Sequence, residues 1–212
     1  MEDINSFLFK YVNKISSLSA RKTKTINSVI SINIRNEIEK SLNAVAFRDY
    51  VIRDLFEISV RQSADHFVAL NNNTWDQFQD QIELDLFSIH STWSLEEEKE
   101  SADLVLHKRI YKNTEATAIV ICHPLVIYEM VLKKIEFWNV ACLPNSEIFD
   151  KFIVLPEDHF VTINKIKRLM FSLEKGLISW GEGLFEVINQ IELLIFCSKL
   201  ATIRSDAIDK TS

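Results

Sequence analysis

The sequence predicts an all-α fold, a single-domain bundle of seven to eight helices. Only three glycines and three prolines occur among 212 residues, so tight turns and helix breakers are scarce. Apolar residues recur at intervals of three and four along most of the chain, the period of a helix with one buried face. The chain is long enough to bury a large core, and no repeat or low-complexity linker divides it. Residues 1–212 are expected to form one domain, with a frayed tail over about 205–212.

In the first half of the chain, polar breaks separate stretches with helical periodicity. The expected helices span residues 4–18, 25–45, 47–67, 78–89 and 94–113. The start of the second is open to a strand interpretation, because three isoleucines alternate with polar residues over 30–34. Ser94 can cap the fifth helix, since Glu97 follows three residues later and completes a capping box. These segments would supply the first half of the bundle.

In the second half, prolines and glycines mark the helix limits. A helix is expected over about 119–135, with Pro124 near its start or at a kink. A short helix from Ser146 to Phe152 and a longer one over about 157–174 should follow, and Gly176 would supply a left-handed residue after the latter. The last helix should run from about Leu184 to Ile203.

Composition narrows the function classes. The formal net charge of −6 and the pI near 5.4 give no electrostatic basis for binding nucleic acid. The three cysteines are odd in number, widely spaced and set in apolar runs, which favours a reducing compartment over a disulfide framework. No signal peptide and no apolar stretch of membrane-spanning length is recognisable. The sequence therefore predicts a cytoplasmic protein without a membrane or nucleic-acid partner.

Five short stretches occur in an order that is more informative than any one of them. They are Phe47–Asp54, Glu83–His90, Cys122–Glu129, Ile148–Ile153 and Phe185–Glu192. Together they resemble the layout of the TenA/thiaminase II branch of the heme-oxygenase-like all-helical superfamily. This resemblance implies a hydrolase that acts on an aminopyrimidine or a related small heterocycle, without a metal or cofactor. Superfamily relatives are often oligomers, so a homo-oligomer is expected by analogy.

The resemblance implies roles for particular residues. Cys122 would be the nucleophile and Glu192 the acid/base that moves the proton. Asp54 would bind the amino group of the pyrimidine. The other substrate-binding candidates are Glu57, Tyr128 and Glu129, and Glu57 stands where the family pattern has an aromatic residue. From the residues alone, Cys122 is better explained as a buried small hydrophobe, and Glu192 is equally explained as a partner for a neighbouring helix.

A second member of the same superfamily, a non-heme di-iron oxidase, is the main competing enzyme interpretation. Glu83 and His90 lie seven residues apart, which would put them on one face of a helix. Glu129 and His159 could complete part of an oxygen-and-nitrogen iron site. The segment after His159 lacks further iron ligands, so the hydrolase remains the preferred interpretation.

Two further interpretations require neither the hydrolase site nor the iron site. Arg61 and His66 fit the Arg-x4-His pattern of HEPN-type ribonucleases, although this spacing can arise by chance and falls early in the chain. A non-catalytic helical binding protein would explain why the tyrosines that bind the pyrimidine in typical TenA-like proteins are not evident. Convergence of Asp54, Cys122 and Glu192 on one cavity would favour the hydrolase over both.

Overall fold

The structure, a computed structural model, describes residues 30–51, 55–70, 82–90, 102–135, 152–154 and 168–209. It is a mixed α/β fold built on a seven-stranded sheet, not an all-α bundle. The strands are β1 (Glu57–Arg61), β2 (His66–Leu70), β3 (Leu84–Ser88), β4 (Ala118–Cys122), β5 (Phe152–Val154), β6 (Leu169–Ser172) and β7 (Gly176–Gly181). The helices are α2 (Ile32–Val45), α3 (Ala102–Asn113), α4 (Leu125–Leu132) and α6 (Leu184–Asp209).

The sheet has the strand order β3-β2-β1-β4-β7-β6-β5. Neighbouring strands pair antiparallel, except that β5 and β6 pair parallel. In the centre, Val120 of β4 lies opposite Ile58 of β1 on one side and Ser179 of β7 on the other. β4 is therefore the middle strand of the sheet, and all five of its residues are buried.

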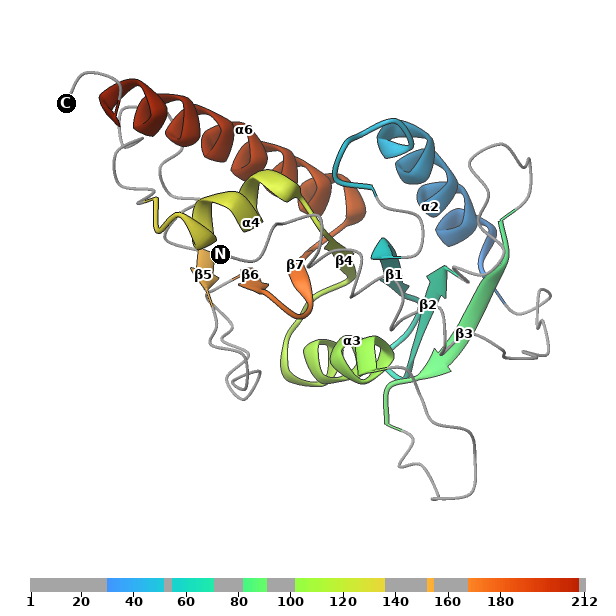
Figure 1. Cartoon of the computed structure of the whole chain (residues 1–212). Coiled ribbons are helices and arrows are strands. Elements are labelled where there is room, and N and C mark those ends of the chain that lie inside the picture. Colours follow the sequence, from blue (N-terminus) through green and yellow to red (C-terminus); the bar gives the residue numbers. More distant parts are fainter. Residues whose placement is uncertain are drawn as a thin grey trace.

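Helices cover both faces of the sheet (Figure 1), with α2, α4 and α6 on one face and α3 on the other. Side chains alternate along each strand, so each strand contributes to two cores. Along β4, Val120 and Cys122 pack with α2, α4 and α6, whereas Ile119 and Ile121 pack with α3. The two cores are thus separated only by the sheet itself.

Two contacts anchor helix ends to the sheet and to each other. The guanidinium group of Arg61, at the end of β1, donates to the carbonyl oxygens of Ala116 and Thr114 just after α3, at 2.9 and 3.2 Å. This places a positive charge at the C-terminal end of the helix dipole, where it is favourable. At the other face, the backbone N–H of Leu184 donates to Glu37 of α2, so one helix caps the start of another.

Several sequence predictions are corrected by these strands. The segment 47–67, expected as one helix, contains β1 and the start of β2, and 78–89 contains β3 within its described part. The helix expected over 119–135 begins instead as β4 and becomes helical only after Pro124. Arg61 and His66 lie on two paired strands, so the HEPN interpretation, which needs them in a helical bundle, is wrong. The helix expected over 4–18 lies outside the described residues.

Other boundaries agree with the sequence. α3 ends at Asn113 and α6 begins at Leu184, as predicted. Gly176 has the left-handed backbone conformation expected of it (φ +75°), but in a strand-to-strand turn, not after a helix. α6 continues to Asp209. Within the described ranges, no helix combines the length and hydropathy that crossing a bilayer requires.

Candidate functional site

The end of the central strand β4 carries a buried histidine–tyrosine pair. His123 directly follows the strand, and its Nδ1 lies 2.7 Å from the hydroxyl of Tyr128 on α4. The two rings are nearly parallel, at an interplanar angle of 12°, and Tyr128 also packs edge-on against Phe171 of β6. Because Pro124 starts a helix immediately after His123, Tyr128 returns one turn later to face the imidazole. The hydrogen bond fixes the orientation of the imidazole ring.

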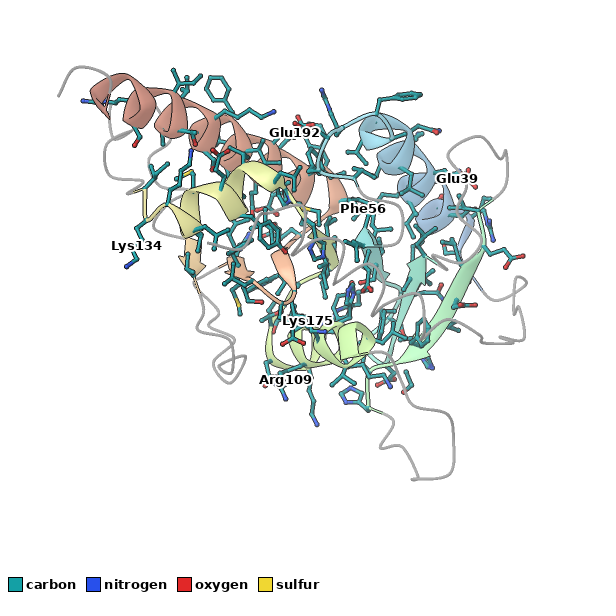
Figure 2. The ribbon with its side chains drawn as sticks, in the orientation of Figure 1. Glu39, Phe56, Arg109, Lys134, Lys175 and Glu192 are labelled. Atoms are coloured by element: carbon teal, nitrogen blue, oxygen red, sulfur yellow. The ribbon has the colours of Figure 1, made fainter. Side chains whose placement is uncertain are left out.

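The turn between β6 and β7 closes over this pair. A Cβ atom added to Gly176 would lie 2.5 Å from the backbone oxygen of Cys122 and 2.9 Å from the imidazole of His123. A side chain here would displace one of these groups, and the left-handed backbone also favours glycine. Lys175 precedes this glycine and brings a positive charge to the same turn (Figure 2). Three segments, the end of β4, helix α4 and the β6–β7 turn, thus meet at His123.

Two residues singled out from the sequence, Cys122 and Glu192, lie on the face of the sheet that carries α6. Tyr50, which follows α2, belongs to the same core cluster as Cys122, and its hydroxyl donates to Glu192 at 3.2 Å. Burial raises the pKa of Tyr50 above its usual value, and the negative charges of Glu192 and of an ionised Cys122 raise this pKa further. Glu192 also forms an ion pair with Arg48 at 3.0 Å. Figure 2 shows Glu192 on the part of α6 nearest to α2.

The environment of Cys122 does not activate its thiol. The residue is completely buried, and burial raises the pKa of the thiol well above its ordinary value. A nucleophilic cysteine requires the opposite, a pKa lowered by nearby positive charge together with access for the substrate. Cys122 therefore packs as a small apolar side chain in the core beneath α6, the alternative interpretation that its sequence context allowed.

The remaining substrate-binding candidates are spread over the molecule. Glu57 lies opposite Ile121 in the sheet, so it points to the α3 face, away from Cys122. Glu129 is on α4 and pairs with Lys133 at 2.6 Å near the surface. Tyr128, on α4, contacts His123 at the end of β4, while Asp54 falls outside the described residues. The described members of this set, Glu57, Tyr128 and Glu129, do not gather around the thiol.

The four residues of the proposed iron site also have different surroundings. Glu83 and His90 flank strand β3, not a helix. Because the chain between them is extended, the two residues lie at opposite ends of the strand and not on one face of a helix. His90 lies 3.6 Å from Asp65, and Glu129 lies on α4 on the other side of the central strands. His159 is outside the described residues. Among the residues that the structure describes, no group of three or more His, Cys, Asp or Glu side chains could hold a metal ion.

A second polar cluster, not expected from the sequence, is buried between the sheet and α3. Oγ of Ser59 lies 2.6 Å from Nδ1 of His107 and 2.8 Å from the hydroxyl of Tyr111. Nε2 of His107 lies 3.3 Å from a carboxylate oxygen of Glu57, but forms no hydrogen bond within the described part of the chain. Burial raises the pKa of Tyr111, while its hydrogen bond to Ser59 opposes this shift.

This second cluster combines the residue types of a serine–histidine–acid triad, but it lacks access. Ser59 is 0% exposed and His107 is 1% exposed, so a substrate cannot reach the hydroxyl without opening the core. The cluster instead joins β1 to α3 through the contacts of the Ser59 hydroxyl with His107 and Tyr111. We therefore place the candidate site at His123 and Tyr128. The sequence signal that could have found it is a histidine placed directly between a buried apolar run and a helix-starting proline.

Comparison with known proteins shows the fold. No protein-family model matches the sequence, and no curated protein sequence matches it. An aldolase II superfamily protein from Pseudomonas syringae has a similar structure, with a TM-score of 0.59, 13% identity and coverage of 87% of this chain and 82% of that chain. The L-fuculose-1-phosphate aldolase of Thermus thermophilus matches with a TM-score of 0.54, 14% identity and coverage of 78% and 92%. A sugar-phosphate aldolase from Thermotoga maritima matches with a TM-score of 0.53, 14% identity and coverage of 83% and 96%.

These similarities overturn the resemblance to the TenA/thiaminase II branch. The similar structures are described as aldolases, and the chain shares their mixed α/β architecture across most of its length. The hydrolase, the di-iron oxidase and the helical binding protein all presupposed a heme-oxygenase-like bundle, so all three interpretations are wrong. The identities of 13–14% establish a shared fold and leave the activity to be argued from the site.

Burial of the cysteine predicts its reactivity. In a Cys142→Ser background, the folded protein should show no reaction with a thiol-specific reagent at neutral pH, because Cys122 and Cys197 are buried and burial raises the pKa of both thiols. Both should react after denaturation. Measurement of released chromophore in native buffer and in denaturant tests this, and rapid labelling of Cys122 in the native protein would show that the thiol is accessible.

The contact at Gly176 predicts a large loss of stability on substitution. Gly176→Ala should lower the free energy of unfolding by roughly 2 kcal/mol or more, because it adds left-handed backbone strain to a clash with the backbone of Cys122. Gly183→Ala is the control, since the nearest heavy atom to its added Cβ would be 3.8 Å away. Chemical denaturation of both variants measures the difference, and equal losses would contradict the packing described for the β6–β7 turn.

Proposed function

We propose that this chain is an aldolase-type lyase that breaks or forms a carbon–carbon bond in a small hydroxy-carbonyl compound, with sugar phosphates as the substrate class. The observation that carries the proposal is the His123–Tyr128 pair at the end of the central strand. It is supported by the fold, since similar structures are described as an L-fuculose-1-phosphate aldolase and a sugar-phosphate aldolase. A small-molecule substrate, predicted from the sequence on other grounds, is retained.

The chemistry of aldol cleavage sets the requirements for such a site. A base removes the proton of the β-hydroxyl group, the bond between the α- and β-carbons breaks, and its electron pair passes into the carbonyl group as an enolate. A proton is then returned to the α-carbon. Histidine is the side chain best suited to accept and return a proton near neutral pH. We assign this proton transfer to His123, with the hydroxyl of Tyr128 holding the ring in place.

The enolate and the phosphate both need positive charge nearby. In proteins, an enolate oxygen is stabilised by a metal ion or a cationic side chain. The described residues contain no group of three or more side chains suited to a metal ion, so we derive no step through a metal. Lys175 lies in the turn that contacts His123, and we assign its ammonium group to the phosphate of the substrate.

A second candidate function is the binding of such a compound without turnover. It is favoured by the burial of the pair, because His123 is 7% exposed and Tyr128 is 2% exposed. A catalytic imidazole must touch the reacting atoms, whereas a buried pair can simply shape the floor of a binding site. The two functions are distinguished by whether a bound sugar phosphate is consumed.

Substitution of the pair tests the proposal. With purified protein and a panel of ketose and aldose phosphates, product formation should be followed by NMR. In His123→Gln, kcat/KM should fall by about 100-fold or more, as expected when a positioned proton-transfer group is removed. Tyr128→Phe keeps the packing against Phe171 and should reduce kcat/KM by about 10-fold, because it removes the hydrogen bond that orients the imidazole of His123.

Tyr111→Phe is the matched control, since it removes a buried tyrosine hydroxyl on the other face of the sheet. Its kcat/KM should stay close to that of the wild type. Cleavage that persists unchanged in His123→Gln would reject the assignment of this residue. A sugar phosphate that raises the melting temperature of the wild type but is not cleaved would favour binding without turnover.

A further inference from the structure

One polar side chain is buried at the end of β6, a strand whose other residues are apolar. Ser172 is 0% exposed, and the three residues before it, 169–171, are apolar and buried as well. A buried hydroxyl group needs a hydrogen-bond partner, because an unpaired one would cost free energy. The partner of Ser172 is the backbone N–H of Lys175, which donates to its Oγ at 2.9 Å. The serine thus ties the last residue of β6 to the turn that follows it.

The sheet register places this serine in one row with the candidate site. Ser172 lies opposite Gly176 across the β6–β7 pair. On the other side of β7, Cys122 lies opposite Leu177, so continuing the antiparallel register by one residue brings His123 opposite Gly176. The missing side chain of Gly176 leaves the space that the imidazole occupies, since an added Cβ would lie 2.9 Å from Nδ1 and from Cε1 of His123. Ser172, Gly176 and His123 are therefore neighbours in one row across the sheet.

The turn between Ser172 and Gly176 is short, and Lys175 is its last residue. Such a turn has a defined backbone when its ends are paired in the sheet and an N–H group within it is hydrogen-bonded. Both conditions hold here, because Gly176 pairs with Ser172 in the left-handed conformation that closes the turn, and the Ser172 hydroxyl accepts from the N–H of Lys175. The start of the Lys175 side chain is therefore held next to the glycine that packs on His123.

We infer that Ser172 is a positioning residue of the candidate site: its hydroxyl holds the turn so that the ammonium group of Lys175 is in place for the phosphate of the substrate. This inference rests on the proposed function, in which Lys175 binds that phosphate. Ser172 itself does not touch a bound compound, because it is 0% exposed. A turn that is ordered before the ligand arrives lowers the entropy cost of binding. The serine should therefore contribute to phosphate affinity and not to the chemical step.

Binding of inorganic phosphate to the purified full chain tests the inference without requiring turnover. In isothermal titration calorimetry, Lys175→Gln should raise the dissociation constant by about 10-fold or more, because a charge-assisted contact with the anion is lost. Ser172→Ala should raise it by about 5-fold, the effect expected from losing one hydrogen bond. Ser198→Ala is the matched control, since Ser198 is also 0% exposed and its hydroxyl donates to the carbonyl oxygen of Leu194 on α6. This control should bind phosphate as tightly as the wild type.

Two further measurements separate positioning from a general loss of structure. If the serine acts only through the lysine, adding Ser172→Ala to Lys175→Gln should weaken phosphate binding no further than Lys175→Gln alone. Ser172→Thr keeps a hydroxyl group and should restore most of the affinity lost in Ser172→Ala. By hydrogen exchange, the amide of Lys175 should exchange about 5-fold faster in Ser172→Ala than in the wild type, because it has lost its acceptor.

The outcomes distinguish this inference from the proposed function. Equal phosphate affinity of the wild type and Ser172→Ala would overturn the inference, as would a double variant in which the two losses add in full. A wild type that does not bind phosphate would reject the roles of both Lys175 and Ser172. If no sugar phosphate is cleaved while phosphate binding still depends on both residues as described, the lyase proposal fails and the inference is supported.

Discussion

The fold depends on β4, a strand that is buried on both faces and hydrogen-bonded on both edges. Its neighbours β1 and β7 pair with it over nearly its whole length. Because its side chains alternate between two cores, the same five residues hold α2, α4 and α6 on one face and α3 on the other. The strand also delivers His123 to the point where α4 begins. The position of the candidate site is thus a consequence of where the central strand ends.

The same strand explains why the sequence predicted the wrong fold class. A strand buried on both faces reads as a continuous apolar run, without the alternation that distinguishes a strand from a helix. The scarcity of glycine was also misleading, because a tight turn between strands does not require glycine. In the β1–β2 turn, the hydroxyl of Ser63 accepts a hydrogen bond from the backbone N–H of Asp65. Two helix limits were predicted well, the start of α6 at Leu184 and the end of α3 at Asn113, whereas the helix expected from residue 119 begins only after Pro124.

The site was less predictable than the helices, because its members are joined only by the folded sheet. His123 and Tyr128 are near in sequence, yet Gly176 reaches them through the pairing of β7 with β4. Cys122 attracted attention as a possible nucleophile, but neighbouring residues on a strand point to opposite faces, and its thiol lies in an apolar core. Burial in the core therefore decides that this thiol is unreactive.

The buried cluster of Ser59, His107 and Tyr111 has a consequence for how the chain folds. If β1 slipped by one residue against β4, Ser59 would move into the apolar core beneath α6 and Ile58 would face the polar groups of α3. Each misaligned state would leave several polar groups desolvated and unpaired, at a cost of about 1–3 kcal/mol for each group. The cluster thus raises the free energy of the alignments that are shifted by one residue relative to the native alignment. The chain therefore populates fewer collapsed states with wrong strand pairing.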